Sequence, residues 1–528
     1  MKDLKIYFTS DLHGYVYPTD YVNTTEKNIG ILNIINSFEK DDNTLIIDGG
    51  DTIQGSPFTN YLSNTDFDVH PIATIFNEGQ YDFVTLGNHD FNYGKKYLKK
   101  YLDNLNAKCV CANVIDNTGE LPIQPYQIKT MANGLEVGIL GITTDFINRW
   151  ERPENIENIN ITDTFDAVAK YFDEVKTKCD LIIGVYHGGF ENDLESHELL
   201  SSTKENIAFK LCKEFDFDIL LTGHQHIPIS NKTIFGTHIV QTPHNGSKFV
   251  KLNLTIDDNG SINIISSLEE IKLNPNKEMF NKFLPLENKV QEWLDTPVGF
   301  LSTELQPGDR LEMALNGSHL ANFINQIQLE TSDADISCTA FANVIHGFNK
   351  NISVRNILST YPYPNTLVVL EVNREILKLA LERSASYFNN DNGNISISQS
   401  FLKPKLEHYN YDYFANIEYT FDLNKEVGNR VVSIKYKGEE LNYTKKLTLV
   451  MNNYRASGAG GYECYDKCKV VKEIVLEMPE IIINYFKNNP NVTVDTTKYI
   501  TVKYLIYTFL NTIKTTTYIS VVVFIIFL

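Results

Sequence analysis

Short apolar runs alternate with amphipathic stretches through about the first 255 residues of the chain. The apolar runs predict strands, and they span residues 4–10, 44–48, 81–86, 108–114, 136–142, 181–186 and 218–222. Between them, residues 31–38 and 165–172 place apolar side chains at the i, i+3, i+4 spacing of a helix. Strands that alternate with helices predict a layered α/β domain.

The pattern changes after a turn signal at residues 257–260. Residues 276–294 predict a helix, despite Pro285, that connects two domains. Beyond it lie a helical stretch at 320–329, a glycine-rich loop at 458–461, and strand-like runs at 366–372, 416–421, 431–435 and 447–451. We expect a first domain over residues 1–270, a linker with a helix over 271–303, a second domain over 304–503, and a hydrophobic tail of unknown role over 504–528.

Composition and charge restrict the class of ligand. The chain has 528 residues, with 42% hydrophobic and 21% charged side chains, which is typical of a globular protein of several domains. The net charge of −19 argues against a polynucleotide-binding surface, which must neutralise several phosphates at once. A small anionic substrate would need local positive charge, and a metal ion can provide it.

The seven cysteines and the two chain ends bear on the compartment. The cysteine spacings do not match a structural zinc site, so we expect reduced thiols. We find no signal peptide and expect a cytoplasmic protein, with peripheral membrane or cell-surface association as the alternative. The apolar run 518–528 is shorter than the ~20 residues of a membrane-spanning helix, which leaves only a weak membrane contact through the tail. No obligatory protein partner is evident.

Five short polar clusters each follow a predicted strand, at residues 11–13, 50–51, 87–90, 187–189 and 223–226. In open α/β sheets, ligands bind in the crevice at the carboxyl ends of the strands. Each cluster alone has a structural explanation; an isolated His187, for example, is more often a buried core histidine. Together they predict a metal centre whose ligands are Asp11, His13, Asp51, Asn88, His187, His224 and His226.

The number and type of these ligands favour two ions over one. Imidazole and oxygen ligands suit divalent Zn, Mn, Fe or Co, and seven side chains exceed the needs of one tetrahedral ion. Two ions that share one carboxylate can bind phosphate oxygens and generate a bridging hydroxide, which attacks phosphorus in line. We expect Mn or Zn, with Fe, Co or Mg as alternatives.

In their order and spacing, these clusters resemble the calcineurin-like metallophosphoesterases. Residues 50–57 and 87–91 are similar to the 5'-nucleotidase superfamily, and residues 361–367, 382–385 and 452–458 resemble bacterial 2',3'-cyclic-nucleotide 2'-phosphodiesterase/3'-nucleotidases. The resemblance covers residues 4 to about 503. It implies an N-terminal four-layer α/β/β/α metallophosphoesterase domain, a linker helix and a C-terminal α/β substrate-binding domain.

The resemblance also implies roles for individual residues. One ion would be held by Asp11, His13, Asp51 and His226, and the other by Asp51, Asn88, His187 and His224. His89 would be the catalytic residue that stabilises or protonates the leaving oxygen. Family 5'-nucleotidases often place an aspartate three residues after this histidine to orient it. Asn92 stands there in this chain, which puts a His–Asp dyad in doubt.

The second domain would bind the nucleoside. Tyr363 and Tyr454 match positions at which the family sandwiches the base, Asn365 would bond the base edge, and Gly458 would let the backbone approach the nucleoside. The phosphate-clamping arginine of true 5'-nucleotidases has no counterpart in residues 334–343.

We therefore expect hydrolysis of 2',3'-cyclic nucleotides to 3'-nucleotides and then to nucleoside and phosphate. The alternatives are a 5'-nucleotidase or broad nucleotide phosphatase, and a non-catalytic nucleotide-binding protein.

Overall fold

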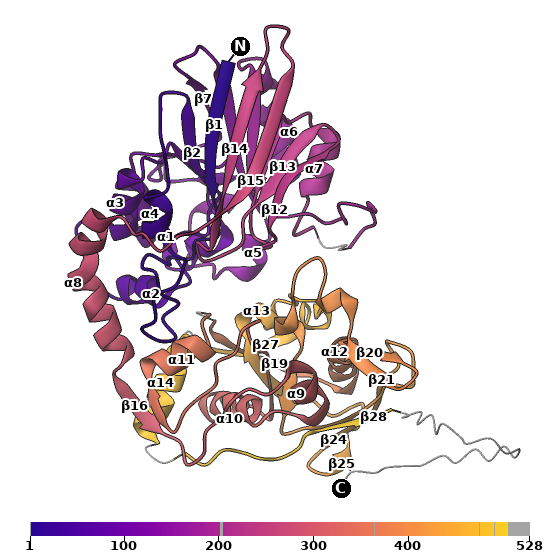
Figure 1. The fold of residues 1–528 in the computed structure, drawn as a ribbon. Coiled ribbons are helices and arrows are strands. Elements are labelled where there is room, and N and C mark those ends of the chain that lie inside the picture. Colours follow the sequence, from indigo (N-terminus) through magenta and orange to yellow (C-terminus); the bar gives the residue numbers. More distant parts are fainter. Residues whose placement is uncertain (1, 201–203, 364, 475, 490–491, 505–528) are drawn as a thin grey trace, which may run out of the picture.

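The computed structural model describes residues 2–200, 204–363, 365–474, 476–489 and 492–504. They form two domains that face each other across a cleft, with one long helix along their side (Figure 1). Of the predicted tail, residues 505–528 lie outside the described residues. Among the described residues, no helix is both long enough and apolar enough to cross a membrane.

The first domain contains two β-sheets. In spatial order, the first sheet consists of β15 (Ile262–Glu270), β14 (Lys248–Ile256), β1 (Lys2–Thr9), β2 (Thr44–Asp48), β3 (Phe83–Val84), β4 (Lys108–Val110) and β6 (Ile123–Gln124). The second consists of β12 (Ile229–Ile234), β13 (Thr237–Gln241), β11 (Ile219–Thr222), β10 (Leu181–His187), β8 (Glu136–Thr143) and β7 (Tyr126–Thr130). Because β1, β2, β3 and β4 are parallel, as are β8, β10, β11 and β13, each set ends at one edge of its sheet.

The sheets pack face to face, and helices cover their outer faces. In β1, Ile6 and Phe8 point into the core between the sheets, whereas Tyr7 points to the helix side, as the two-residue period of a strand requires. The helices on the outer faces are α1 (Ile31–Ile35), α3 (Pro71–Glu78) and α4 (Gly94–Asp103) on the first sheet, and α6 (Thr164–Lys176) and α7 (Ala208–Glu214) on the second. The predicted four-layer α/β/β/α arrangement is confirmed.

The apolar runs did not predict β6, β7, β12, β13, β14 or β15, and two further features of the first domain differ from the predicted elements. The turn at 257–260 does not end the layered region but joins β14 to β15 in a hairpin, with Lys248 opposite Glu270. The pattern missed β15 because its outer face is exposed, so it lacks a continuous apolar run. The run at 108–114 is divided between β4 and β5 (Val114–Asp116), which belong to different sheets.

The predicted linker helix is α8 (Lys277–Leu294), which includes Pro285 and is capped by the Asn276 side chain. It packs on the first domain through Trp293, whose ring centroid lies 5.6 Å from that of Tyr61. Arg355 of α11 (Val354–Thr360) in the second domain donates to Asp295 Oδ1 at 2.8 Å and to the Tyr21 carbonyl at 2.9 Å. The end of α8 is therefore tied to both domains.

The second domain is also α/β. Its main sheet has the order β22 (Tyr413–Ala415), β17 (Ile336–Thr339), β26 (Leu447–Asn452), β19 (Leu367–Val372) and β27 (Lys469–Ile474). A smaller sheet has the order β25 (Glu439–Glu440), β24 (Val431–Tyr436), β23 (Glu418–Asp422) and β28 (Ile500–Lys503). One continuous core joins them to α10 (His319–Ser332), α12 (Arg374–Ala385) and α14 (Met478–Asn488).

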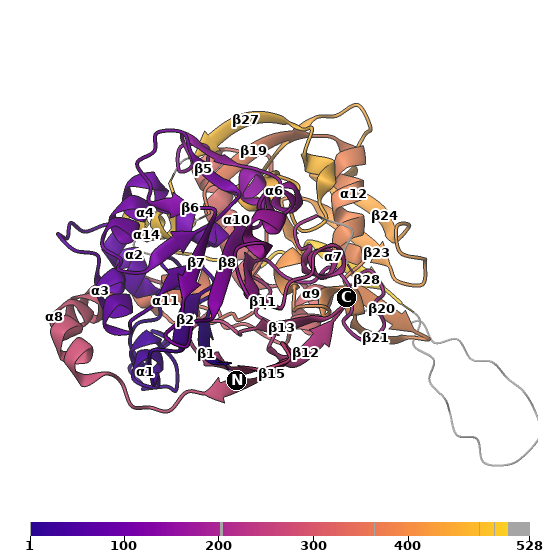
Figure 2. The same ribbon diagram turned by 90° about the horizontal axis from the view of Figure 1, so that it is seen from above.

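The two domains meet at α5 (Ile147–Trp150) of the first and α13 (Asn453–Ala456) of the second (Figure 1). Figure 2, seen from above, shows the first domain lying over the second, with α8 at the outer side. Arg149 donates to the Ser457 carbonyl and pairs with Asp466, both at 3.2 Å. This contact places the second domain over the strand ends of the first.

Candidate active site

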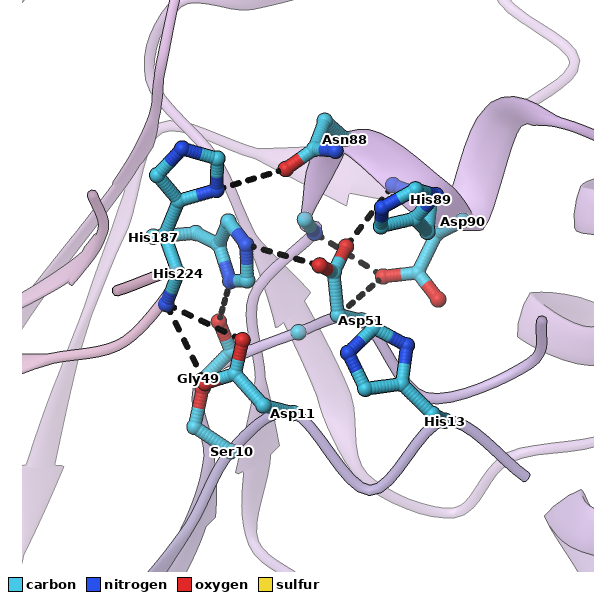
Figure 3. A network of polar contacts seen from close by, with 12 residues as sticks. Ser10, Asp11, His13, Gly49, Asp51, Asn88, His89, Asp90, His187 and His224 are labelled. Atoms are coloured by element: carbon cyan, nitrogen blue, oxygen red, sulfur yellow. Dashed lines mark hydrogen bonds and ion pairs between the residues drawn. The ribbon is translucent and has the colours of Figure 1, made fainter. Parts of the chain in front are cut away.

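The structure brings all seven predicted metal ligands together at the carboxyl ends of the parallel strands. Figure 3 shows Asp51 at the centre of the group, with His187 and His13 on opposite sides of it. Asp11 and His13 follow β1, Asp51 follows β2, Asn88 and His89 lie on the 3-10 helix after β3, His187 ends β10, and His224 and His226 follow β11. The parallel strands thus convert residues that are far apart in sequence into one cluster.

The backbone of the cluster is unusual. Asp11, His13, Asp51, His224 and His226 have φ values between 48° and 70°, a left-handed conformation that few non-glycine residues adopt. Such strain gathers at functional sites, where it aims side chains inward. Neighbouring glycines allow the turns to pack: a Cβ on Gly87 would lie 2.1 Å from Asp51 Oδ1.

Asp11, His13 and His226 form one group whose ligand atoms all lie within 4.8 Å of one another. Asp11 Oδ1 lies 3.2 Å from His226 Nε2, and His13 Nε2 lies 3.3 Å from the same nitrogen. Because His13 Nδ1 donates to the Gln54 carbonyl at 3.1 Å, its Nε2 carries a lone pair. The Asp11 carboxylate and the Nε2 atoms of both rings therefore converge on one point.

Asp51, His187 and His224 form the second group within the same limit. His187 Nδ1 donates to the Gly49 carbonyl at 2.8 Å, which leaves the buried Nε2 for a metal ion or a proton, 3.1 Å from Asp51 Oδ2. His224 Nε2 donates to Glu205 Oε1 at 2.8 Å, which leaves a lone pair on Nδ1, 3.0 Å from Asn88 Oδ1. These facing acceptors fit a divalent cation, and the backbone carbonyl and the carboxylate fix the tautomers that ligation requires.

In the absence of a cation, bound protons must balance the negative charge of the buried carboxylates. Burial lowers the pKa of His187, but the charge of Asp51, its hydrogen bond to the ring and the charge of Asp11 together raise the pKa to about 10. Burial raises the pKa of Asp11, but its hydrogen bond to His226 and the charge of that ring hold the pKa below its usual range. Bound metal ions and these protons would compete for the same lone pairs.

Asp90 organises the loop that carries Asp51. Its carboxylate accepts hydrogen bonds from the backbone N–H groups of Asp51, Thr52, Ile53 and Gly87 at 2.8–3.0 Å. It does not orient His89, whose Nδ1 lies 2.8 Å from Asn92 Oδ1. The site therefore lacks a His–Asp dyad.

A cavity of about 590 Å³ lies between the two domains. It is lined by Asp51, Asn88, His89, His224 and His226 from the first domain and by Tyr363, Asn365 and Tyr454 from the second. Gly458 is not part of this lining. Its φ of 81° and the 2.0 Å that would separate an added Cβ from Asp466 Oδ1 identify it as a turn residue beside the cavity.

Among the cavity residues that the sequence analysis did not name are Trp150, Glu151, Glu205 and Lys405. The Trp150 ring stacks on His224, with centroids 5.6 Å apart, and lies 6.3 Å from the Tyr454 ring. Glu151 contacts Asn92, and Glu205 contacts His224 and lies 3.8 Å from Lys405 Nζ. Trp150 and Glu151 follow the carboxyl end of β8, at the same edge of the sheets as the other clusters. Their position after a predicted strand could therefore have indicated that they lie near the site. Glu205 and Lys405 lie in loops without such a pattern.

Comparison with known families supports both domains. A model described as calcineurin-like phosphoesterase matches residues 4–228, and one described as 5'-nucleotidase, C-terminal domain, matches residues 297–467. Members of the first family are hydrolases with a dinuclear divalent metal centre, which agrees with the two ligand groups of this chain.

Individual relatives cover most of the chain. A 2',3'-cyclic-nucleotide 2'-phosphodiesterase/3'-nucleotidase from Yersinia enterocolitica is 25% identical over 86% of this chain and 80% of its own length. The trifunctional nucleotide phosphoesterase protein YfkN from Bacillus subtilis is 25% identical over 91% of this chain, which spans only 38% of that protein.

A solved structure extends the comparison. A Staphylococcus aureus protein, provisionally named a 5'-nucleotidase and crystallised with α-ketoglutarate, is 33% identical, with a TM-score of 0.89 over 95% of this chain and 100% of its own. The resemblance predicted from the motifs is confirmed. The chain belongs to the family in which a calcineurin-like phosphoesterase domain is followed by a 5'-nucleotidase C-terminal domain.

Proposed function

We propose that this protein is a two-metal phosphohydrolase that acts on nucleotides. The observation that supports it most is one cavity whose lining includes His226 of the first ligand group, Asp51 and His224 of the second, and aromatic side chains of the second domain. A phosphate bound at the ligands can then have its nucleoside in the second domain. The net charge of −19 argues against a polynucleotide substrate.

In this proposal, Asp11, His13 and His226 hold one ion, Asn88, His187 and His224 hold the other, and Asp51 is shared. When bound, the two ions supply charge that stabilises phosphate oxygens and activates water. The fixed tautomers of His13, His187 and His224 keep one lone pair of each ring directed at the ions. Mn or Zn fits this ligand set, with Fe, Co or Mg as alternatives.

His89 is the proposed catalytic residue beside the ions. Its backbone N–H holds Asp51 Oδ1 at 2.7 Å, and its ring lies at the cavity, 5.4 Å from the His13 ring between centroids. A ring nitrogen at this position can stabilise or protonate the leaving oxygen of a phosphate ester.

Tyr363 and Tyr454 would bind the base by stacking, and Asn365 would contact its edge. Tyr454 rests on the buried Arg455, which pairs with Asp412 at 2.9 Å and donates to the Tyr409 carbonyl at 2.8 Å. This support keeps one aromatic face in place. Gly458 shapes the turn beside the cavity. Its approach to the nucleoside stays a prediction.

Within this class, we propose hydrolysis of 2',3'-cyclic nucleotides followed by release of phosphate from the 3'-nucleotide. Relatives with that name, from Yersinia enterocolitica among others, support this substrate. The cavity wall at residues 340–344 contains no arginine, in contrast to the clamp expected of 5'-nucleotidases.

A 5'-nucleotidase is the second candidate, because the 33% identical Staphylococcus aureus protein is provisionally named as one. Phosphate release from matched 2',3'-cyclic, 3' and 5' nucleotides, with Mn or Zn added, separates the two. We expect release from the cyclic and 3' series to exceed release from the 5' series. The reverse order would favour the second candidate, and no release from any nucleotide would favour a non-catalytic binding protein.

The predicted boundaries at residues 270, 303 and 503 stay proposals that limited proteolysis can test. The cytoplasmic location stays a prediction, which cell fractionation can test.

A further inference from the structure

A chain of three side chains leads from His89 away from the cavity. His89 Nδ1 lies 2.8 Å from Asn92 Oδ1, and Asn92 Nδ2 donates to Glu151 Oε2 at 2.5 Å. Glu151 follows α5, so this chain connects two separate loops of the first domain. His89 and Glu151 both line the cavity.

The Glu151 carboxylate is held from its other side. Its Oε1 accepts from Asn155 Nδ2 at 2.7 Å and from the Arg152 backbone N–H at 2.8 Å. Asn155 Nδ2 also donates to the Asn92 carbonyl at 2.9 Å. An ionised carboxylate only accepts hydrogen bonds, so every group around Glu151 must be a donor.

This requirement fixes the Asn92 amide. If the amide were flipped, its oxygen would face the carboxylate oxygen of Glu151 at hydrogen-bond distance, and both atoms are acceptors. Asn92 Oδ1 must therefore point to His89, and His89 Nδ1 must carry the hydrogen. The nitrogen left for chemistry at the cavity is Nε2.

We propose that Glu151 is a positioning residue that acts on His89 through Asn92, and that Glu151 requires asparagine rather than aspartate at position 92. An aspartate at position 92 would set two carboxylates 2.5 Å apart. The inference rests on the proposed function only for the catalytic role of His89; the orientation of the ring follows from the hydrogen bonds.

A double substitution can test the pair because it exchanges donor and acceptor. In Asn92→Asp with Glu151→Gln, the aspartate accepts from His89, and the glutamine nitrogen donates to that aspartate. The glutamine oxygen still accepts from Asn155 and from the Arg152 N–H. Each single substitution instead leaves two acceptors, or two donors, face to face.

The first measurement is steady-state hydrolysis of a 3'-nucleotide and of bis(4-nitrophenyl) phosphate, whose leaving group needs little assistance. We expect each single variant to lose about 10–100-fold in kcat on the nucleotide, part of the range of general acid catalysis, with KM and metal content unchanged. We expect the double variant to recover to within about threefold of wild type, because the two changes are coupled. All variants should hydrolyse the nitrophenyl ester nearly normally.

Glu154→Gln is the matched control, since it removes the same charge three residues further on from a side chain that is 60% exposed. It should behave as wild type on both substrates. A double variant that loses as much as the product of the two single losses, or equal losses on both substrates, would overturn the positioning role. A wild-type protein that releases no phosphate from any nucleotide would overturn the proposed function and the catalytic role of His89.

A second measurement does not depend on activity. In the zinc-loaded protein with ¹⁵N-labelled histidine, the ring signals missing from His89→Asn identify His89. We expect them to show hydrogen on Nδ1 in the wild type and in the double variant. A ring that carries its hydrogen on Nε2 alone would overturn the proposed hydrogen-bond chain.

Discussion

Asp90 holds the backbone around the metal ligand Asp51, although it is not itself a ligand. Its carboxylate collects four backbone N–H groups around Asp51. In Asp90→Asn, one amide N–H₂ would face these donors. We expect metal affinity to fall by about 10–100-fold, as for other groups that orient ligands.

Competition with a chelator of known affinity measures this effect, and Asp103→Asn, an exposed change of the same charge, is the control. Unchanged metal affinity in Asp90→Asn would show that the loop keeps its shape without the carboxylate.

His89 should matter for turnover and not for metal content. It has no place in either ligand group, and its Nδ1 is engaged by Asn92. In His89→Ala we expect kcat on nucleotides to fall by ~10²–10⁴, with two equivalents of metal retained. Kinetics together with elemental analysis test this, and parallel loss of metal and activity would identify His89 as a ligand instead.

At this scale, residues were predictable where a local signal existed. Asp11, Asp51 and His187 each follow an apolar run directly, so their shared edge could be expected from the chain alone. Glu205 and Lys405 reach the site from loops, and no local spacing relates them to His224. The contact between Asn92 and Glu151 likewise depends on the path of a loop, which the pattern of apolar and polar residues does not predict.

Among the elements, α8 carries a buried carboxyl that should make stability depend on pH. Burial raises the pKa of Glu287 to about 7, although Gln291 and Tyr21 donate to it. The folded state thus retains a proton that the unfolded state loses above its usual pKa of 4.5. This contribution to stability is fully present below pH 4.5 and is lost as pH rises to about 7.

Glu287→Gln should remove this part of the pH dependence, at most about 3 kcal/mol between pH 4.5 and 8. Urea unfolding at several pH values measures it as a difference in slope. The exposed Glu292 on the same helix provides the control, Glu292→Gln. Equal slopes in wild type and Glu287→Gln would mean that the carboxyl is ionised in the folded protein.

The strands that lead to the metal ligands and the linker helix were predictable, whereas β6, β7, β12, β13, β14 and β15 of the first domain were not. The linker helix was expected over 276–294 and is α8, because its apolar positions keep helical spacing on both sides of Pro285. β15 was missed since a strand at the edge of a sheet can expose one face to water. Its pairing with β14 is a tertiary contact that the local pattern does not reveal.

In the whole molecule, chemistry and nucleoside recognition lie in different domains and should be separable. Tyr363 belongs to the second domain, lines the cavity and is 39% exposed, whereas the metal ligands belong to the first domain. Tyr363→Ala with Tyr454→Ala removes two aromatic faces, each contributing about 1–3 kcal/mol to base binding. We expect a much higher KM for nucleotides and little change on nitrophenyl esters.

Tyr443→Ala, a change at a 72% exposed tyrosine of the same domain, is the control for general damage. If the double variant loses activity equally on nucleotides and on nitrophenyl esters while metal and fold are intact, the tyrosines support the catalytic centre and not the base.

The central claim is that two divalent ions at this ligand cluster are required for nucleotide hydrolysis. The most direct test measures metal content and phosphate release on the same sample, before chelation, after chelation, and after stepwise return of Mn or Zn. We expect activity to be lost with the metal and to recover completely only near two equivalents per chain. The activity of Asp51→Asn, which lacks the shared carboxylate, should not recover when metal is returned. Full turnover in a protein stripped of metal, or recovery at one equivalent with Asp51→Asn equal to wild type, would contradict this claim.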